Sequence, residues 1–245
     1  MLDVIKNKQG EKIDYTFHYG SQKNRYLLIV GHGVTGDKDH SLVAGLSENV
    51  ANEGMSVLRF SFSGNGESEG RFQESTISKG IDDLYAILTT ATKQGWRPIY
   101  AGYDMGSAIG VLTASIDSRI QLLISLAGIV KTQVFSQAEF GVVSPNNAYM
   151  RGDPKCPLSH EFVDDMKQIN SVLPRASSVE IPWLLVHGTA DEIVPITDSH
   201  SLILNFENSR ELIEIDGADH LFSGGAINIL SESVIDWLGR KLQAN

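Results

Sequence analysis

The chain has 245 residues, of which 42% are hydrophobic and 20% are charged, and its formal net charge is −10 at pH 7. This length and composition are typical of one globular α/β domain and exclude a disordered chain. The acidic balance argues against binding to nucleic acid or to an anionic membrane, because both attract clustered lysine and arginine.

Targeting signals and disulfides are not predicted. Residues 1–10 are polar, and no stretch approaches the ~20 apolar residues that span a bilayer. The single cysteine, Cys156, excludes an intrachain disulfide and lies in a proline-flanked loop, without the strand-turn-helix context of a nucleophile. We therefore expect one soluble, cytoplasmic domain over residues 1–245.

Short apolar runs of strand length alternate with longer amphipathic segments, which is typical of a mostly parallel sheet flanked by helices. The predicted strands are Tyr26–Val30, Ser56–Phe62, Pro98–Gly102, Gln121–Ala127, Pro182–His187 and Glu211–Ile215. The predicted helices are Ser41–Asn52, Thr76–Lys93, Met105–Ser115, Thr197–Asn205 and Ala226–Lys241. Residues 11–19 are expected to add an antiparallel hairpin at the edge of the sheet.

A glycine-rich turn at residues 31–36, Gly-His-Gly-Val-Thr-Gly, follows the first of these strands. Such a turn lets a backbone N–H face the end of the sheet, and we expect the N–H of Val34 to form one half of an oxyanion hole. His32 is expected to be structural. The glycine-rich turn at residues 63–70, after the next strand, is interpreted as a structural turn that borders the site.

The most informative segment, Gly102-Tyr103-Asp104-Met105-Gly106, joins a predicted buried strand directly to a predicted helix. The pattern small-x-nucleophile-x-small allows the sharp turn that projects a central side chain above a sheet. The first N–H groups of the helix favour negative charge there, and that of Met105 would be the second oxyanion donor. Taken alone, the segment equally fits a tight connection in which Asp104 caps the helix.

The stretch from about residue 131 to 180 interrupts the alternation of strands and helices, with four prolines and weak periodicity. About fifty residues without a core strand, inside a compact domain, indicate a lid or insertion rather than a plain loop. Tyr149 is the one tyrosine of this stretch. We expect Tyr149 and Tyr103 to contact the substrate.

Acidic turns follow the last two predicted strands, with Asp191 in the first and His220 in the second. The chain order nucleophile, acid, histidine is that of the α/β-hydrolase triad. We therefore predict a catalytic group of Asp104, Asp191 and His220, in which the histidine is the general base and Asp191 orients it. Asp216 and Asp219 are rival acids, but both adjoin the histidine on its own loop.

Together these features resemble the α/β-hydrolase superfamily over about residues 15–242. The segments most similar to bacterial cinnamoyl and feruloyl esterases are residues 32–36, the strand Arg59–Phe62 with the glycine turn after it, the short insertion, and His187–Pro195. The resemblance implies hydrolysis of small carboxylic esters without a cofactor. The chain departs from those esterases at Asp104, where they carry serine, and at Tyr103, where they usually carry histidine.

Haloalkane dehalogenases, fluoroacetate dehalogenases and epoxide hydrolases of the same fold do carry aspartate at the nucleophile position. There the carboxylate attacks an sp³ carbon, and histidine-activated water hydrolyses the ester intermediate. The tryptophan that commonly binds halide after the nucleophile is Met105 here. Epoxide opening in these enzymes resembles a reaction of two lid tyrosines. Residues 131–180 contain only Tyr149, and Tyr103 could substitute for the second tyrosine.

Three hypotheses therefore stay open: an esterase-type hydrolase in which serine has become Asp104, a true aspartate-nucleophile hydrolase, and a catalytically silent protein that binds a small ligand. A carboxylate is a poor nucleophile toward an ester carbonyl, and it places His220 between two carboxylates, which favours the charged imidazolium. The expected partner is a small-molecule substrate. No metal, nicotinamide or flavin is expected, because ligand-like histidine spacing and a G-x-G-x-x-G turn in the required context are lacking.

Overall fold

A computed structural model of the chain describes residues 2–21, 25–141, 148–204 and 210–243. The strands are β1 (Tyr15–His18), β2 (Tyr26–Gly31), β3 (Ser56–Phe60), β4 (Arg97–Tyr103), β5 (Leu122–Leu126), β6 (Trp183–Gly188) and β7 (Arg210–Ile215). The α-helices are α1 (Ser41–Asn52), α2 (Ile77–Lys93), α3 (Met105–Ala114), α4 (Thr132–Phe140), α5 (His160–Ile169), α6 (Leu173–Ala176), α7 (Thr197–Leu204) and α8 (Ala226–Gln243). Two short 3₁₀ turns are η1 (Phe72–Glu74) and η2 (Met150–Gly152).

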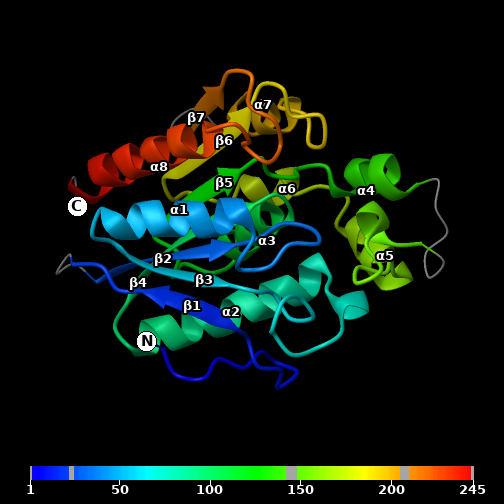
Figure 1. The fold of residues 1–245 in the computed structure, drawn as a ribbon, viewed down its shortest axis with the longest axis horizontal. Coiled ribbons are helices and arrows are strands. Elements are labelled where there is room, and N and C mark those ends of the chain that lie inside the picture. Colours follow the sequence, from blue (N-terminus) through cyan, green and yellow to red (C-terminus); the bar gives the residue numbers. More distant parts are fainter. Residues whose placement is uncertain (1, 22–24, 142–147, 205–209, 244–245) are drawn as a thin grey trace.

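The strands form one sheet in the order β1-β3-β2-β4-β5-β6-β7 (Figure 1). β1 runs antiparallel to β3, and the other neighbouring strands pair in parallel. The predicted mostly parallel sheet flanked by helices is therefore confirmed. The predicted bounds of the strands and helices differ from those observed by at most two residues, although Asn205 lies outside the described residues.

Alternate residues of the central strands enter two separate cores, as the pleat of a strand requires. In β2, Leu27 and Ile29 face a core that includes apolar residues of α2 and α3. Leu28 and Val30 face a second core, shared with α1 and α8. All four side chains are fully buried, which explains why these strands are continuous apolar runs.

The N-terminal hairpin is displaced from its predicted position. Residues 15–18 form a single edge strand, whereas the tight reversal comes earlier, where Lys6 and Lys12 form an isolated bridge. The N–H of Ile13 donates to the carbonyl of Ile5 at 3.0 Å. Gly10, with φ +83°, supplies the left-handed residue that this reversal needs. The expected hairpin over residues 11–19 was therefore wrong in its position along the chain.

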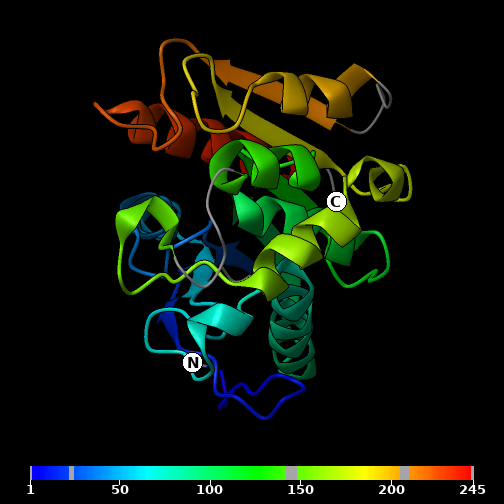
Figure 2. The same cartoon turned by 90° about the vertical axis from the view of Figure 1, so that its right-hand side faces the viewer.

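The stretch that interrupts the strand–helix alternation contains α4, η2, α5 and α6, at the end of the molecule to which the parallel strands point (Figure 1). Figure 2 views the molecule from this end. The stretch leaves and rejoins the core at one place, since the N–H of Val172 donates to the carbonyl of Val130 at 2.9 Å. The hydroxyl of Ser159 also donates to the carbonyl of Gln73, at 2.7 Å. That the stretch acts as a lid stays a prediction.

The glycine-rich turn after β3 is held by a buried carboxylate. Asp83 of α2 accepts the N–H and the hydroxyl of Ser63 at 2.7 and 2.8 Å, and the amide of Asn7 at 2.8 Å. Burial raises the pKa of Asp83, although these hydrogen bonds oppose the rise. This network fits the interpretation of residues 63–70 as a structural turn. Among the described helices, none is long and apolar enough to cross a membrane.

Replacing Asp83 with alanine would leave three buried or partly buried donors without their acceptor. We expect Asp83→Ala to lower the free energy of unfolding by about 2–4 kcal/mol. The neighbouring Asp82→Ala, at a half-buried position on the same helix, should change it by less than ~0.5 kcal/mol. Urea denaturation of both variants measures the difference, and equal stabilities would contradict the role given to Asp83.

Candidate active site

Asp104 occupies the sharp turn between β4 and α3, with φ +53° and ψ −115°. The turn requires small neighbours. A Cβ on Gly102 would overlap the carbonyl of Gly106, and one on Gly106 would lie 2.6 Å from the carbonyl oxygen of His32. A non-glycine residue in this backbone region is strained by ~1–3 kcal/mol and persists only where packing enforces it. The side chain of Asp104 caps no N–H of α3, so the helix-cap interpretation of Asp104 was wrong.

The structure brings Asp104, Asp191 and His220 together at this end of the sheet. Nδ1 of His220 lies 2.8 Å from Oδ2 of Asp191, and Nε2 lies 3.5 Å from Oδ2 of Asp104. The rival carboxylates are engaged elsewhere. Asp216 accepts a threonine hydroxyl at 3.2 Å, and Asp219 accepts a backbone N–H at 2.8 Å. The geometry therefore favours Asp191 as the partner of the histidine.

Asp191 is fixed by donors on both of its oxygens. Oδ1 accepts the N–H groups of Ile193 and Val194 at 2.9 and 2.8 Å. Oδ2 lies 3.2 Å from Nε2 of His187, in addition to its contact with His220. Burial alone would raise the pKa of Asp191, but the hydrogen bonds from the two histidines outweigh it and hold that pKa well below its usual range. Asp191 is therefore a permanent anion.

His187 is part of this site, and the sequence interpretation did not assign it a role. It is fully buried at the end of β6. Its Nε2 lies 2.9 Å from the carbonyl of Val194, and its Nδ1 lies 2.8 Å from the hydroxyl of Ser199. Because both neighbours of Nε2 are acceptors, the proton belongs on Nε2, which lies 2.9 Å from the carbonyl of Val194 and 3.2 Å from Oδ2 of Asp191. The signal available in the sequence was the four-residue spacing between His187 and Asp191.

One predicted oxyanion donor is already engaged. The N–H of Val34 donates to Oδ2 of Asp104 at 3.3 Å. Gly33 permits this approach, since a Cβ there would lie 2.6 Å from Cβ of Asp104. Met105 is the first residue of α3, directly after Asp104, and the role of its N–H as the second donor stays a prediction.

His220 is buried to 3% exposure between the two carboxylates. Burial would lower the pKa of its imidazole, but hydrogen bonds and charges of Asp104 and Asp191 outweigh burial and raise that pKa to about 9. The two carboxylates therefore favour the protonated imidazole at neutral pH. A protonated imidazole cannot accept a proton, so His220 is not a free base in this state.

His32 has a structural environment. It is fully buried, and burial lowers its pKa to about 4. Nε2 accepts the N–H of Phe62 at 2.9 Å, and Nδ1 donates to the carbonyl of Gly33 at 2.8 Å. A neutral imidazole thus ties the glycine-rich turn to the end of β3, as a structural histidine would.

The two predicted substrate-contacting tyrosines lie in different surroundings. Tyr103 is 3% exposed, and its hydroxyl donates to the carbonyl of His220 at 3.3 Å. Tyr149 is 54% exposed at the start of η2, where its backbone bridges to Pro157. A contact of either residue with substrate stays a prediction.

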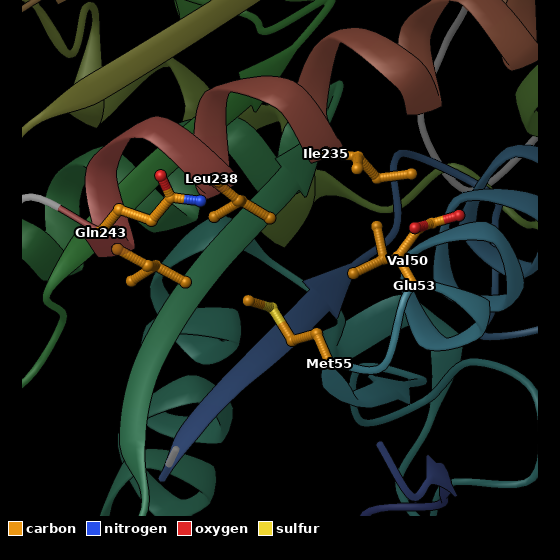
Figure 3. A pocket seen from close by; sticks show the side chains of 8 residues that line it. Val50, Glu53, Met55, Ile235, Leu238 and Gln243 are labelled. Atoms are coloured by element: carbon orange, nitrogen blue, oxygen red, sulfur yellow. The ribbon is translucent and has the colours of Figure 1, made fainter. Parts of the chain in front are cut away.

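A separate groove of about 290 Å³ lies between α1 and α8 (Figure 3). Its walls are the apolar side chains of Val50, Met55, Ile235 and Leu238, with Glu53 at the rim. The catalytic candidates do not line it. This groove therefore does not bear on the chemistry at Asp104.

No protein-family model matches the chain. The curated relatives include YfhR of Salmonella typhi, 26% identical over 92% of this chain and 76% of its own length. They also include α/β-hydrolase domain-containing protein 17B of Xenopus tropicalis, 25% identical over 89% of this chain and 68% of its own length. A monoglyceride lipase homolog of monkeypox virus is 21% identical over 79% of this chain and 81% of its own length.

Solved structures agree on the architecture. Est1E from Butyrivibrio proteoclasticus with bound ferulic acid superposes with a TM-score of 0.88, at 22% identity over 98% of this chain and 99% of that one. Mouse α/β-hydrolase domain-containing protein 10 has a TM-score of 0.78, at 19% identity over 98% of this chain and 99% of its own. The chain therefore has the α/β-hydrolase fold, and at these identities the likeness shows the fold alone.

The backbone of the turn around Asp104 leaves no room for a side chain at Gly102. We expect Gly102→Ala to lower the free energy of unfolding by about 2 kcal/mol or more. As a matched control, Gly239→Ala in α8, where an added Cβ meets nothing within 4 Å, should raise it by ~0.5–1 kcal/mol. Thermal and urea unfolding compare the two, and a neutral Gly102→Ala would contradict the tight packing.

His220 should also make stability depend on pH. Its pKa is about 9 in the fold against an ordinary 6.5, so its contribution is complete below 6.5 and is lost as the pH rises through 9. We expect the free energy of unfolding to decrease over this window, and the decrease to shrink in Asp104→Asn. Urea unfolding and ¹⁵N NMR titration of the imidazole measure both effects. A His220 that titrates below pH 7 would contradict them.

Proposed function

We propose that this chain is an esterase-type hydrolase for small carboxylic esters, in which Asp104 takes the place of the nucleophilic serine. The observation that carries the proposal is the site of Asp104 itself, which lies within reach of both an oxyanion donor and the catalytic histidine. Oδ2 of Asp104 is 3.3 Å from the N–H of Val34 and 3.5 Å from Nε2 of His220. A serine hydroxyl at this turn would have the base and the oxyanion donor that acyl transfer requires.

In the resting protein, Asp104 engages both the oxyanion donor and the histidine. Its carboxylate takes the N–H that would stabilise a tetrahedral oxyanion, and its charge helps to keep His220 protonated. Attack of the carboxylate on an ester carbonyl would, in addition, produce a reactive anhydride. We therefore expect slow ester hydrolysis with Asp104 and faster hydrolysis when a serine replaces it.

A second candidate is an aspartate-nucleophile hydrolase that acts on an sp³ carbon. The observation that favours it is that His220, Asp191 and the N–H of Val34 are all in place around Asp104. Hydrolysis of an ester formed on Asp104 would use these three groups. Attack of the Asp104 carboxylate on the carbon would break the C–halogen bond and release halide, or break a C–O bond and open an epoxide to an alkoxide that takes up a proton. The ester formed carries no charge at Asp104, so the pKa of His220 would fall because one of its two carboxylate partners is lost. The histidine could then deprotonate the attacking water.

The Asp104→Ser variant separates these candidates. We expect it to hydrolyse p-nitrophenyl acetate and butyrate at least ~100-fold faster than the unaltered protein, because a free base and a free oxyanion donor each contribute at about this scale. Purified proteins are compared by initial rates and by acyl-enzyme bursts. Asp104→Ser combined with His220→Ala should lose the gain, and Asp104→Asn should show none.

If Asp104→Ser cleaves no ester, the esterase proposal is wrong. The unaltered protein would then be incubated with haloacids and epoxides. A covalent adduct on Asp104 by mass spectrometry, absent in Asp104→Asn, would support the second candidate.

A further inference from the structure

Tyr103 lies directly before Asp104, at the end of β4, and its side chain is directed to the histidine loop. Its hydroxyl donates to the backbone carbonyl of His220 at 3.3 Å. The two rings also touch, with centroids 5.2 Å apart and planes inclined by 37°. One side chain thus contacts both the backbone and the imidazole of the same residue.

The ring of Tyr103 is itself held in place. The imidazole of His40, which precedes α1, stacks on it with centroids 5.5 Å apart and planes inclined by 26°. The exposed fraction of Tyr103 is 3%, so its orientation is set by packing rather than by solvent. A series of ring contacts, stacked between His40 and Tyr103 and tilted between Tyr103 and His220, therefore joins the start of α1 to the loop between β7 and α8.

The histidine loop is held on either side of His220 by backbone hydrogen bonds, from the N–H of Ala190 to the carbonyl of Ala218 at 3.0 Å and from the N–H of Phe222 to the carbonyl of Asp219 at 3.1 Å. The carbonyl of His220, in contrast, accepts the hydroxyl of Tyr103. The loop follows β7, where Gly217 has φ +67°, and Phe222, just after the histidine, has φ +52°. Both are backbone conformations that a regular element does not supply. The imidazole is oriented by Asp191, but that contact leaves the backbone of His220 to be fixed by other groups.

We propose that Tyr103 is a positioning residue for His220: its hydroxyl fixes the loop carbonyl, and its ring packs against the imidazole that lies between Asp104 and Asp191. Among the described residues, the carboxylates that face the imidazole are those of Asp104 and Asp191, whereas Asp219, the preceding residue of the loop, is exposed and accepts the N–H of Ser223. An aromatic ring within about 6 Å of a cation is attracted to it, most strongly where water is excluded. The proposal rests on the same triad as the proposed function, but it concerns the charge and mobility of His220, which can be measured without any substrate.

Two variants separate the hydroxyl from the ring. Tyr103→Phe keeps the ring, so we expect the pKa of His220 to stay near that of the unaltered protein while the backbone of His220 and its neighbours becomes more mobile. Tyr103→Leu removes both, and we expect the same mobility together with a pKa lowered by about 0.5–1. ¹⁵N NMR titration of the imidazole reports the pKa, and backbone relaxation with amide exchange reports the mobility.

Tyr100→Phe is the matched control. Tyr100 is another buried tyrosine of β4, and its hydroxyl donates to the carbonyl of Gly106 at 2.9 Å, away from the histidine loop. It should change neither the pKa nor the loop mobility. Unchanged mobility in Tyr103→Phe would overturn the proposal even if Tyr103→Leu does not fold. Folded Tyr103→Leu with an unaltered His220 pKa would overturn the role of the ring.

Discussion

His220 is confined between two buried carboxylates, and the rest of the site is arranged around the charge that this creates. Two carboxylates with one imidazolium leave a net negative charge in a region where the side chains of Asp104 and Asp191 are 1% and 0% exposed. Such a group is tolerated only if hydrogen-bond donors surround it. The backbone N–H groups of Val34, Ile193 and Val194 provide that compensation, together with the positive end of α3.

The turn that carries Asp104 restricts the size of the neighbouring residues more than it restricts the residue at position 104. Gly33, Gly102 and Gly106 are needed because any side chain there would meet backbone or the side chain of Asp104. Position 104 needs only a residue that packing can hold at positive φ, which serine and aspartate both satisfy. The fold therefore places the side chain of residue 104 without choosing its chemistry, and a likeness in fold does not identify which reaction, if a protein catalyses one, takes place there.

The sequence was sufficient wherever a local pattern had one physical solution. Apolar runs of strand length predicted the buried strands, and the order of their polar ends predicted that Asp104, Asp191 and His220 would meet. The role of His187 depends on which way an imidazole turns at the end of a buried strand, and periodicity carries no information on that. The direction of Tyr103 depends likewise on a loop that is distant in sequence. The N-terminal reversal was placed too late because a single positive-φ glycine, Gly10, decides its register.

The protonation state of His220 also distinguishes the two candidate reactions. With a serine at position 104, one of the two carboxylates is gone, and His220 can act as a base from the first step. With Asp104, two carboxylates favour the imidazolium, and the proposed covalent bond to the carboxylate of Asp104 would remove one of these charges. In both proposed reactions the same histidine would be the general base, and the identity of residue 104 would determine whether that base is available before or after the first bond is formed.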